Sequence, residues 1–211
     1  MSKKYHPYIF DNEKRQLVGK FDEMYQAEKT EGFDGWFQED SRHTSRRIIE
    51  AVLGGFNFNN ILDIGCGKGS FTHRLKKANN QVLGLDLSET AIKICRERYP
   101  DCQFDTLDVS QPSALPEYLE KNELDVDPIF DLTLILETFS YLENWRDIIS
   151  DVSTCSRRVC TSLFLPENPI GFVPSAEVFV SEIEKYFEVT ELIQVHSCRS
   201  TIVVGSSLKF D

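Results

Sequence analysis

An apolar run that leads directly into alternating glycines is the feature that most constrains this chain. Residues 60–64 read NILDI and predict a buried strand, and residues 65–70 read GCGKGS. Glycine lets the backbone turn sharply and approach a ligand closely, because it has no Cβ atom. A strand, a glycine-rich turn and a helix in succession predict an open α/β sheet with a ligand site beyond the carboxyl end of the strand. The glycines of this turn are Gly65, Gly67 and Gly69.

The remainder of the chain alternates between strand and helix patterns. The predicted strands are residues 60–64, 81–85, 102–106, 130–136, 158–164, 188–196 and 201–208. The predicted helices are residues 41–53, 69–77, 89–98, 115–121, 145–155 and 175–186. Such alternation predicts an α/β fold with a mostly parallel open sheet and helices on both faces. The loop between the last two strands is too short for a crossover helix, so a C-terminal antiparallel strand is expected.

The length of 211 residues is sufficient for one buried core. Residues 1–40 precede the alternating pattern, are rich in aromatic and charged side chains, and contain the turn signals of GFDGW. We therefore expect an N-terminal arm at residues 1–40 and an α/β domain at residues 41–211.

Charge and cysteine usage limit the partners and the compartment. The chain carries 23 Lys and Arg against 34 Asp and Glu, and the resulting net charge of −11 disfavours binding to nucleic acid. The basic segment at residues 42–47 has helical spacing and is interpreted as a solvated face. The 6 cysteines form no Cys-x-x-Cys pair, so no metal site is predicted and a reducing, cytoplasmic location is expected. No apolar run long enough for a membrane helix is found, so no membrane association is expected.

The glycine spacing also distinguishes between cofactors. The pattern Gly-x-Gly-x-Gly departs from the Gly-x-Gly-x-x-Gly of a pyrophosphate turn, which disfavours a nicotinamide dinucleotide enzyme. Asp63 precedes the first glycine by two residues, where a carboxylate suits a cationic ligand. The sequence LDIGCGKG resembles the first motif of the class I S-adenosylmethionine-dependent methyltransferase family. The resemblance covers about residues 41–208 and implies a Rossmann-like fold with S-adenosylmethionine as cofactor and S-adenosylhomocysteine as product.

The resemblance implies a role for residues at three strand ends. Asp63, Gly65 and Gly67 would line the methionine end of the cofactor, and Cys66 and Gly69 would also bind the cofactor. Asp86 would accept the two ribose hydroxyls, and Leu87 would pack on the adenine. For Asp86 the alternative is a helix cap, a role that Ser88 already supplies.

The adenine contact at the next strand end is open between two carboxylates. Asp108 occupies the position where this family commonly binds the adenine amino group, with Leu107 beside the ring. Asp105 lies three residues earlier, and either carboxylate could instead cap a turn.

The fourth strand and the residues after it, FDLTLILETFSYLENW, resemble the small-molecule branch of the family. On that match Leu136 and Glu137 reach the cofactor, and Tyr141 stands where the family pattern has histidine. Tyr141 would orient an acceptor and Glu137 would accept a proton, although Glu137 could instead hold a backbone amide. The Asn/Asp-Pro-Pro-Tyr turn of enzymes that methylate nucleobases is absent from this position, which argues against a nucleobase acceptor.

Residues 21–37 resemble the lid of nodulation-type N-methyltransferases that act on amino sugars. Tyr25 and Trp36 would then lie over the cofactor and attract its sulfonium, or they could simply anchor the arm on the core. Phe172 is a candidate substrate contact, with core packing as the alternative. Of the four histidines, only His6 and His43 lie in segments that could reach the site, and neither is predicted to act as a base.

The sequence thus predicts an S-adenosylmethionine-dependent methyltransferase that acts on oxygen or nitrogen of a small molecule, such as a sugar or a natural-product intermediate. A monomer or a homodimer is expected. The alternative is a regulatory protein that retains the fold and the cofactor site without catalysis.

Overall fold

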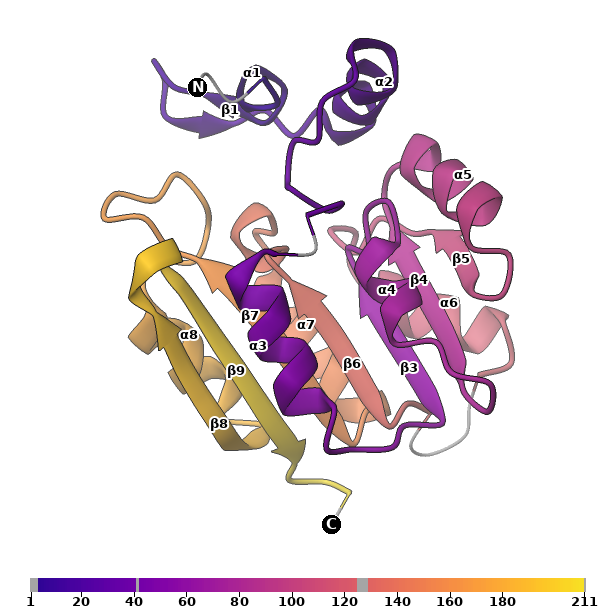
Figure 1. Cartoon of the computed structure of the whole chain (residues 1–211). Helices are drawn as coiled ribbons and strands as arrows, with labels where there is room; N and C mark the ends of the chain where they lie inside the picture. Colours follow the sequence, from indigo (N-terminus) through magenta and orange to yellow (C-terminus); the bar gives the residue numbers. More distant parts are fainter. Residues whose placement is uncertain (1–3, 41, 125–128, 211) are drawn as a thin grey trace.

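Seven strands form one twisted open sheet in the order β5-β4-β3-β6-β7-β9-β8 (Figure 1). The computed structural model describes residues 4–40, 42–124 and 129–210. The strands are β3 (Asn60–Ile64), β4 (Gln81–Asp86), β5 (Gln103–Thr106), β6 (Leu132–Leu136), β7 (Arg158–Phe164), β8 (Phe187–Val195) and β9 (Ser200–Ser207). All pairings from β5 to β7 are parallel, whereas β9 is antiparallel to both β7 and β8. The predicted fold class and the terminal antiparallel pair are therefore confirmed.

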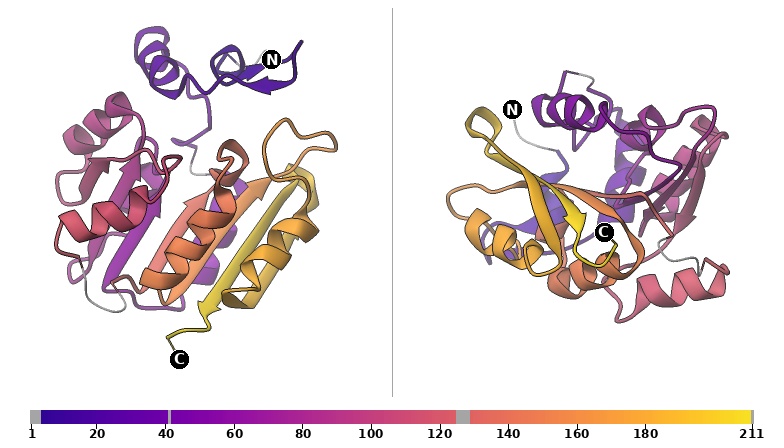
Figure 2. Two further views of the ribbon diagram at one scale, coloured as in Figure 1. Left: turned by 180° about the vertical axis from the view of Figure 1, so that it is seen from behind. Right: turned by 90° about the horizontal axis from the view of Figure 1, so that it is seen from below.

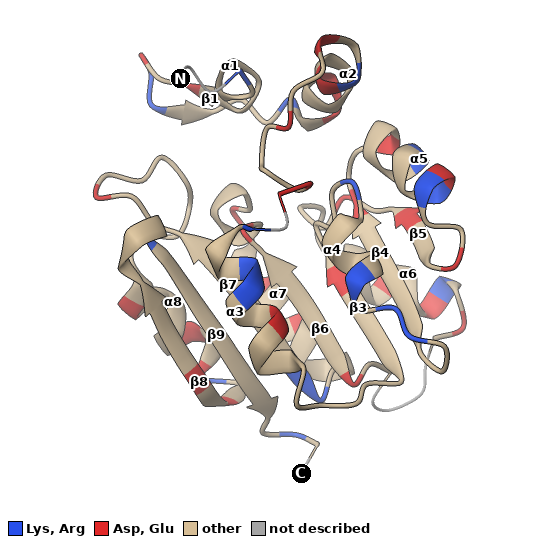
Figure 3. Ribbon diagram, viewed as in Figure 1, with Lys and Arg blue, Asp and Glu red and all other residues tan. Residues whose placement is uncertain are grey.

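Helices cover both faces of the sheet (Figure 2). One face carries α3 (Thr44–Leu53), α4 (Ser70–Arg74) and α5 (Glu89–Arg98), and the other carries α6 (Ala114–Lys121), α7 (Trp145–Cys155) and α8 (Ala176–Ile183). Successive strand residues serve opposite faces, as the period of a strand requires. Ile61 packs in the core with α3 and α5, and Leu62 packs in the core with α6 and α7. Charged side chains are concentrated on the helices and loops, and the central strands are largely free of them (Figure 3).

The predicted elements differ from the observed ones mainly at their ends. The helix predicted at 69–77 ends at Arg74, and the helix predicted at 175–186 ends at Ile183. The helix predicted from residue 41 begins at Thr44. Ser41 itself lies outside the described residues. The five buried cysteines and the half-buried Cys198 are all free thiols, as expected.

Residues 4–40 form a cap above the carboxyl ends of the strands (Figure 1). This N-terminal cap consists of α1 (His6–Ile9), the short hairpin of β1 (Phe10–Asp11) and β2 (Gln16–Leu17), and α2 (Phe21–Glu31), followed by an irregular segment. Its apolar side chains form a small core around Ile9, Met24 and Tyr25, which Ala91 of α5 completes. None of the helices in the described part of the chain combines the length and apolarity that crossing a bilayer requires.

Candidate functional site

A cavity of about 510 Å³ lies between the carboxyl ends of the strands and the cap. Its floor is made by the ends of β3, β4, β6 and β7 and by the residues that follow β5, and cap residues from Tyr5 to Gln38 form its other wall. This volume is within the range of small-molecule sites, and the position matches the place where open α/β sheets bind ligands.

The glycine turn after β3 adopts the backbone conformation that only glycine tolerates easily. Gly65, Gly67 and Gly69 have φ values of 75°, 56° and 74°. A Cβ atom on Gly65 would collide with the side chain of Thr138, and one on Gly67 would lie 2.6 Å from the Tyr25 hydroxyl. Gly65 lines the cavity, whereas Cys66, Gly67 and Gly69 shape the turn without lining it.

Asp63 lies beneath this turn and does not line the cavity. Its side chain is buried and accepts a hydrogen bond of 2.6 Å from the Thr72 hydroxyl. Burial raises the pKa of Asp63 to about 6, and the nearby charge of Asp86 adds to this effect. Asp63 therefore supports the glycine turn from beneath. It does not lie at the cavity surface, where the resemblance placed it beside the methionine end of the cofactor.

Asp86 ends β4 and lines the cavity. One carboxylate oxygen accepts the backbone N–H of Gly67 at 2.9 Å, and the other accepts the backbone N–H of Ser88 at 2.9 Å. Each oxygen keeps a second lone pair for a ligand hydroxyl. Ser88 caps α5 by accepting the Ala91 N–H, so Asp86 is not the cap of that helix. Burial raises the pKa of Asp86 to about 6.

Apolar side chains flank Asp86 in the same cavity. Leu87, Leu107, Val109 and Leu136 all line it. Asp108 also lines the cavity, but its carboxylate accepts hydrogen bonds from Ser110 and Gln111 of its own turn. Asp105 is absent from the lining and accepts bonds from Arg96 and Tyr118 instead. Of the two carboxylates, Asp108 is the one at the cavity.

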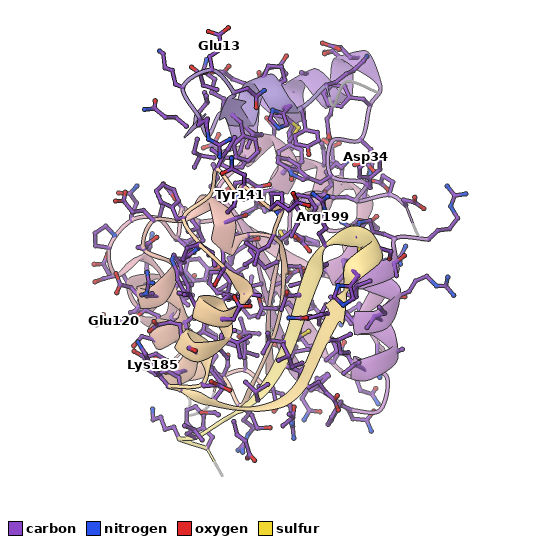
Figure 4. The ribbon with its side chains drawn as sticks, turned by 90° about the vertical axis from the view of Figure 1, so that its left-hand side faces the viewer. Glu13, Asp34, Glu120, Tyr141, Lys185 and Arg199 are labelled. Atoms are coloured by element: carbon purple, nitrogen blue, oxygen red, sulfur yellow. The ribbon has the colours of Figure 1, made fainter. Side chains whose placement is uncertain are left out.

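The cap contributes the two aromatic residues that the sequence placed over the cofactor. Tyr25 and Trp36 both line the cavity, and their ring centroids are 5.5 Å apart. The Gln38 amide donates to the Tyr25 hydroxyl at 3.0 Å. The Trp36 indole donates to the Tyr141 hydroxyl at 3.3 Å, which joins the cap to the turn after β6. Figure 4 shows Tyr141 at the junction between the cap and the sheet.

Glu137 and Tyr141, the candidate catalytic residues, both line the cavity. Glu137 follows β6 with a φ of 57°, and its carboxylate accepts bonds from the hydroxyls of Ser162 and Ser200 and from the Phe164 N–H. Burial raises the pKa of Glu137, and burial also raises the pKa of Tyr141 well above its usual value. Tyr141 is thus a neutral phenol at neutral pH.

Arg46, which was interpreted as part of a solvated face, lines the cavity, as does His43, whose segment was expected to reach the site. Arg46 and His43 lie at the start of α3. The Arg46 guanidinium donates to the backbone carbonyls of Trp36 and Phe37. Within the described residues it has no carboxylate at ion-pair distance. The basic pattern of residues 42–47 indicated that a cation was present here, but helical spacing alone did not show which side of the helix faces the site. Phe172, by contrast, is half-exposed and does not line the cavity.

Polar contacts anchor the cap at three places around the cavity. Lys68 of the glycine turn is 3.0 Å from Glu28 and 3.0 Å from Asp34 of the cap. Asp22 accepts hydrogen bonds from the Ser88 hydroxyl and from Thr90 at the start of α5. At the other side the Arg15 guanidinium donates to Asn168 in the loop after β7.

The sheet order and this cavity are those of an open α/β domain with a ligand site at the carboxyl ends of its strands. Residues 62–158 match the family model described as "Methyltransferase domain". This segment of the chain is thus a methyltransferase domain, in agreement with the resemblance seen in the sequence.

Curated relatives share part of their length with the chain. A ubiquinone biosynthesis O-methyltransferase from Alkalilimnicola ehrlichii is 30% identical over 111 residues, which are 53% of this chain and 41% of that protein. A demethylmenaquinone methyltransferase from Oceanobacillus iheyensis is 23% identical over 67% of this chain and 56% of its own length. The chain thus spans less than two thirds of the length of either relative.

Among solved structures, the N-methyltransferase NodS from Bradyrhizobium japonicum in complex with S-adenosylhomocysteine has a TM-score of 0.66. The match covers 87% of this chain and 98% of that chain at 18% identity. Identity at this level shows a shared fold.

Proposed function

We propose that this chain transfers a methyl group from S-adenosylmethionine to oxygen or nitrogen of a small molecule. The position of Asp86 is the observation that carries the proposal. Its carboxylate lies at the carboxyl end of β4, is held by two backbone N–H groups, and faces a cavity that the glycine turn also lines. A carboxylate in this position suits two neighbouring hydroxyls, as in the ribose of the cofactor.

The other cavity residues fit the remaining parts of the cofactor. Leu87 and Leu107 provide apolar walls for a planar base, and Asp108 lies beside them as an acceptor for its amino group. Gly65 leaves space for close approach at the end of β3.

Arg46 suits the amino-acid end of the cofactor. It is a cation at the cavity wall, and two of its N–H groups are bound to carbonyls of the cap. A guanidinium has five N–H donors, so donors remain for an incoming carboxylate. Arg46 is half-buried, so its charge is partly withdrawn from water, and a ligand carboxylate would offset the cost of that desolvation.

When bound, S-adenosylmethionine supplies an electrophilic methyl group on a sulfonium. The residues of the chain then have to orient the acceptor and exclude water, and a correctly held acceptor accounts for much of the acceleration. Tyr25 and Trp36 present aromatic faces that favour a sulfonium. Tyr141 is a neutral donor that would orient the acceptor, and Glu137, with its raised pKa, would accept a proton from it.

The cap limits the acceptor to a small molecule. Three sets of polar contacts hold it over the cavity, and its aromatic residues form the wall. A net charge of −11 further disfavours an acceptor that belongs to a nucleic acid.

Calorimetric binding of S-adenosylmethionine and S-adenosylhomocysteine to the purified chain tests the proposal. We expect micromolar affinity, about −8 kcal/mol. Asp86→Ala should weaken it strongly, whereas Asp105→Ala, at the neighbouring strand end but outside the cavity, should not. Absence of binding to folded wild-type protein would refute the proposal. Binding without transfer to any sugar, amine or hydroxylated small molecule would favour the regulatory alternative.

A further inference from the structure

The cavity extends beyond the cofactor residues to a second end over β7 and β9. Ser162, Phe164, Cys198 and Ser200 line this acceptor end, together with His43 and Ser45 from the start of α3. The Ser45 hydroxyl is 3.4 Å from the Cys198 sulfur, which fixes α3 against the turn between β8 and β9. Asp86 and Asp108 lie at the other end, because β4 and β5 are separated from β7 by β3 and β6.

His43 presents an unused hydrogen-bonding atom at the acceptor end. Its Nδ1 atom is buried and has no hydrogen-bond partner among the described residues. Burial lowers the pKa of His43, and the charge of Arg46 lowers it further, while Asp40 acts in the opposite direction. His43 is therefore a neutral imidazole at neutral pH, and the unpaired ring nitrogen can accept a proton. A buried polar atom without a partner is costly, which indicates a role for it in the ligand complex.

The charges at this end disfavour an ammonium group. Arg46 places a positive charge beside His43. Glu137 is the carboxylate at this end, and its oxygens already accept three hydrogen bonds from the ends of β7 and β9. With the cofactor carboxylate bound to Arg46, this end offers a protonated amine no free carboxylate as a partner. A hydroxyl does not need one.

Two aromatic rings add a preference for a flat acceptor. Phe37 of the cap is 51% exposed although it lines the cavity, and Phe164 at the end of β7 is 43% exposed. Phe37 also holds a φ of 53°, a conformation that is costly for a bulky residue. Strained backbone of this kind persists where the surrounding structure requires it, and it clusters at ligand sites.

We propose that the acceptor is a hydroxylated aromatic ring, held between Phe37 and Phe164, and that His43 Nδ1, in place of the hydrogen-bonded Glu137, takes the proton from its hydroxyl. This rests on the proposed methyl transfer. The acceptor O–H bond breaks and its proton passes to Nδ1. The oxygen forms the new bond to the methyl carbon, and the electron pair of the methyl–sulfur bond stays on sulfur, which becomes a neutral thioether. His43 then returns the proton to solvent.

A comparison of catechol, 4-nitrocatechol and benzylamine as acceptors, with saturating S-adenosylmethionine at neutral pH, tests this. We expect both catechols to be methylated in preference to benzylamine. His43→Gln should lower transfer to catechol about 100-fold, which is typical for loss of a general base. The loss for the more acidic 4-nitrocatechol should be much smaller, because its hydroxyl ionises without help. His43→Asn should behave like His43→Gln, and His196→Gln, on the exposed turn outside the cavity, should have no effect.

Three outcomes would overturn the inference: a preference for benzylamine, no transfer to either catechol, or equal losses for both catechols in His43→Gln. Binding of S-adenosylhomocysteine is measured in parallel on each variant. Retained binding in the first two outcomes leaves the methyltransferase proposal standing, whereas absent binding to the wild type contradicts that proposal itself. Unchanged binding in His43→Gln also shows that the variant is folded.

Discussion

The Lys68 ammonium lies 3.0 Å from the Glu28 carboxylate, and the two side chains are only 8% and 4% exposed. Lys68 belongs to the glycine turn and Glu28 to α2, so this buried ion pair joins the cap to the floor of the cavity. Asp34 provides a second carboxylate at 3.0 Å from the same ammonium. The ammonium group of Lys68, a residue of the glycine turn, therefore helps to hold the cap in place.

Replacement of Lys68 should release the cap. Lys68→Met leaves Glu28 buried without its cation, and the loss of one partner of a buried pair costs about 3 kcal/mol. Glu28→Gln should cost less, because Lys68 keeps Asp34. Urea denaturation measures the stability, and limited proteolysis measures exposure of residues 33–40. Equal stability of Lys68→Met and wild type would show that the pair does not hold the cap.

Replacement of Arg46 should affect one end of the cofactor only. Arg46→Met removes the cation proposed for the cofactor carboxylate, and a charge-assisted bond of this kind contributes about 1.5–3 kcal/mol. The affinity for S-adenosylhomocysteine should fall by roughly 10- to 100-fold. The affinity for 5′-methylthioadenosine, which lacks the amino-acid end, should stay the same, whereas Asp86→Ala should weaken both. Calorimetry with the two ligands decides, and an equal loss for both in Arg46→Met would contradict the assignment.

Cofactor binding should weaken in acid. The pKa of Asp86 is raised to about 6 by burial, so the carboxyl takes up a proton as the pH falls through that value and can no longer accept two ligand hydroxyls. Affinity for S-adenosylhomocysteine should fall roughly tenfold per pH unit below this point. Asp86→Asn should bind weakly at every pH. A pH series of binding measurements checks this, and a flat profile for the wild type would exclude Asp86 as the titrating group.

The same raised pKa has the opposite effect on the ligand-free fold. The folded state binds this proton more tightly than the unfolded chain, so the stabilising contribution is present below the ordinary pKa of 3.8 and is lost as the pH rises through about 6. Asp63, whose pKa is also raised to about 6, acts in the same direction. Thermal melts of the ligand-free protein across this range, with Asp86→Asn and Asp63→Asn as controls, should separate the two carboxyls.

A side chain at Gly67 should separate the cap from the turn. Gly67→Ala places a Cβ atom at a φ of 56°, against the Gln38 amide and 2.6 Å from the Tyr25 hydroxyl. We expect a loss of cofactor affinity together with increased proteolysis of the cap. Gly55→Ala is the matched control, because the nearest atom to its Cβ would be 4.0 Å away. Equal affinity of both variants would indicate that the cap adjusts without cost.

The parallel sheet and the strand-end residues could be predicted from the sequence because their signals are local. Apolar runs, glycines and the acidic residue at the end of β4 can each be recognised within a few positions of the sequence, and the order of elements follows from their alternation. The hairpin of β1 and β2 could not be predicted, since strands of two residues have no period to detect.

The residues that were missed act across long distances in the chain. Lys68 meets Glu28 and Asp34 only after the cap has folded back, and Arg46 reaches the cavity from α3, where Ser45 packs against Cys198. The basic side chains of residues 42–47 could equally face solvent or the cavity. Only the packing of α3 decides which of them point into the cavity. The choice between Asp105 and Asp108 likewise depended on which of them faces the cavity.

The Arg15 contact with Asn168 lies on the opposite side of the cavity from the contact of Asp22 with α5. Because the cap is held on both sides of the cavity, we expect a bound molecule to leave faster when either contact is broken. The strength of these contacts would then govern the residence time of a product separately from the rate of methyl transfer. Variants of Arg15 should thus change the residence time of S-adenosylhomocysteine and the steady-state turnover, while a single turnover keeps its rate.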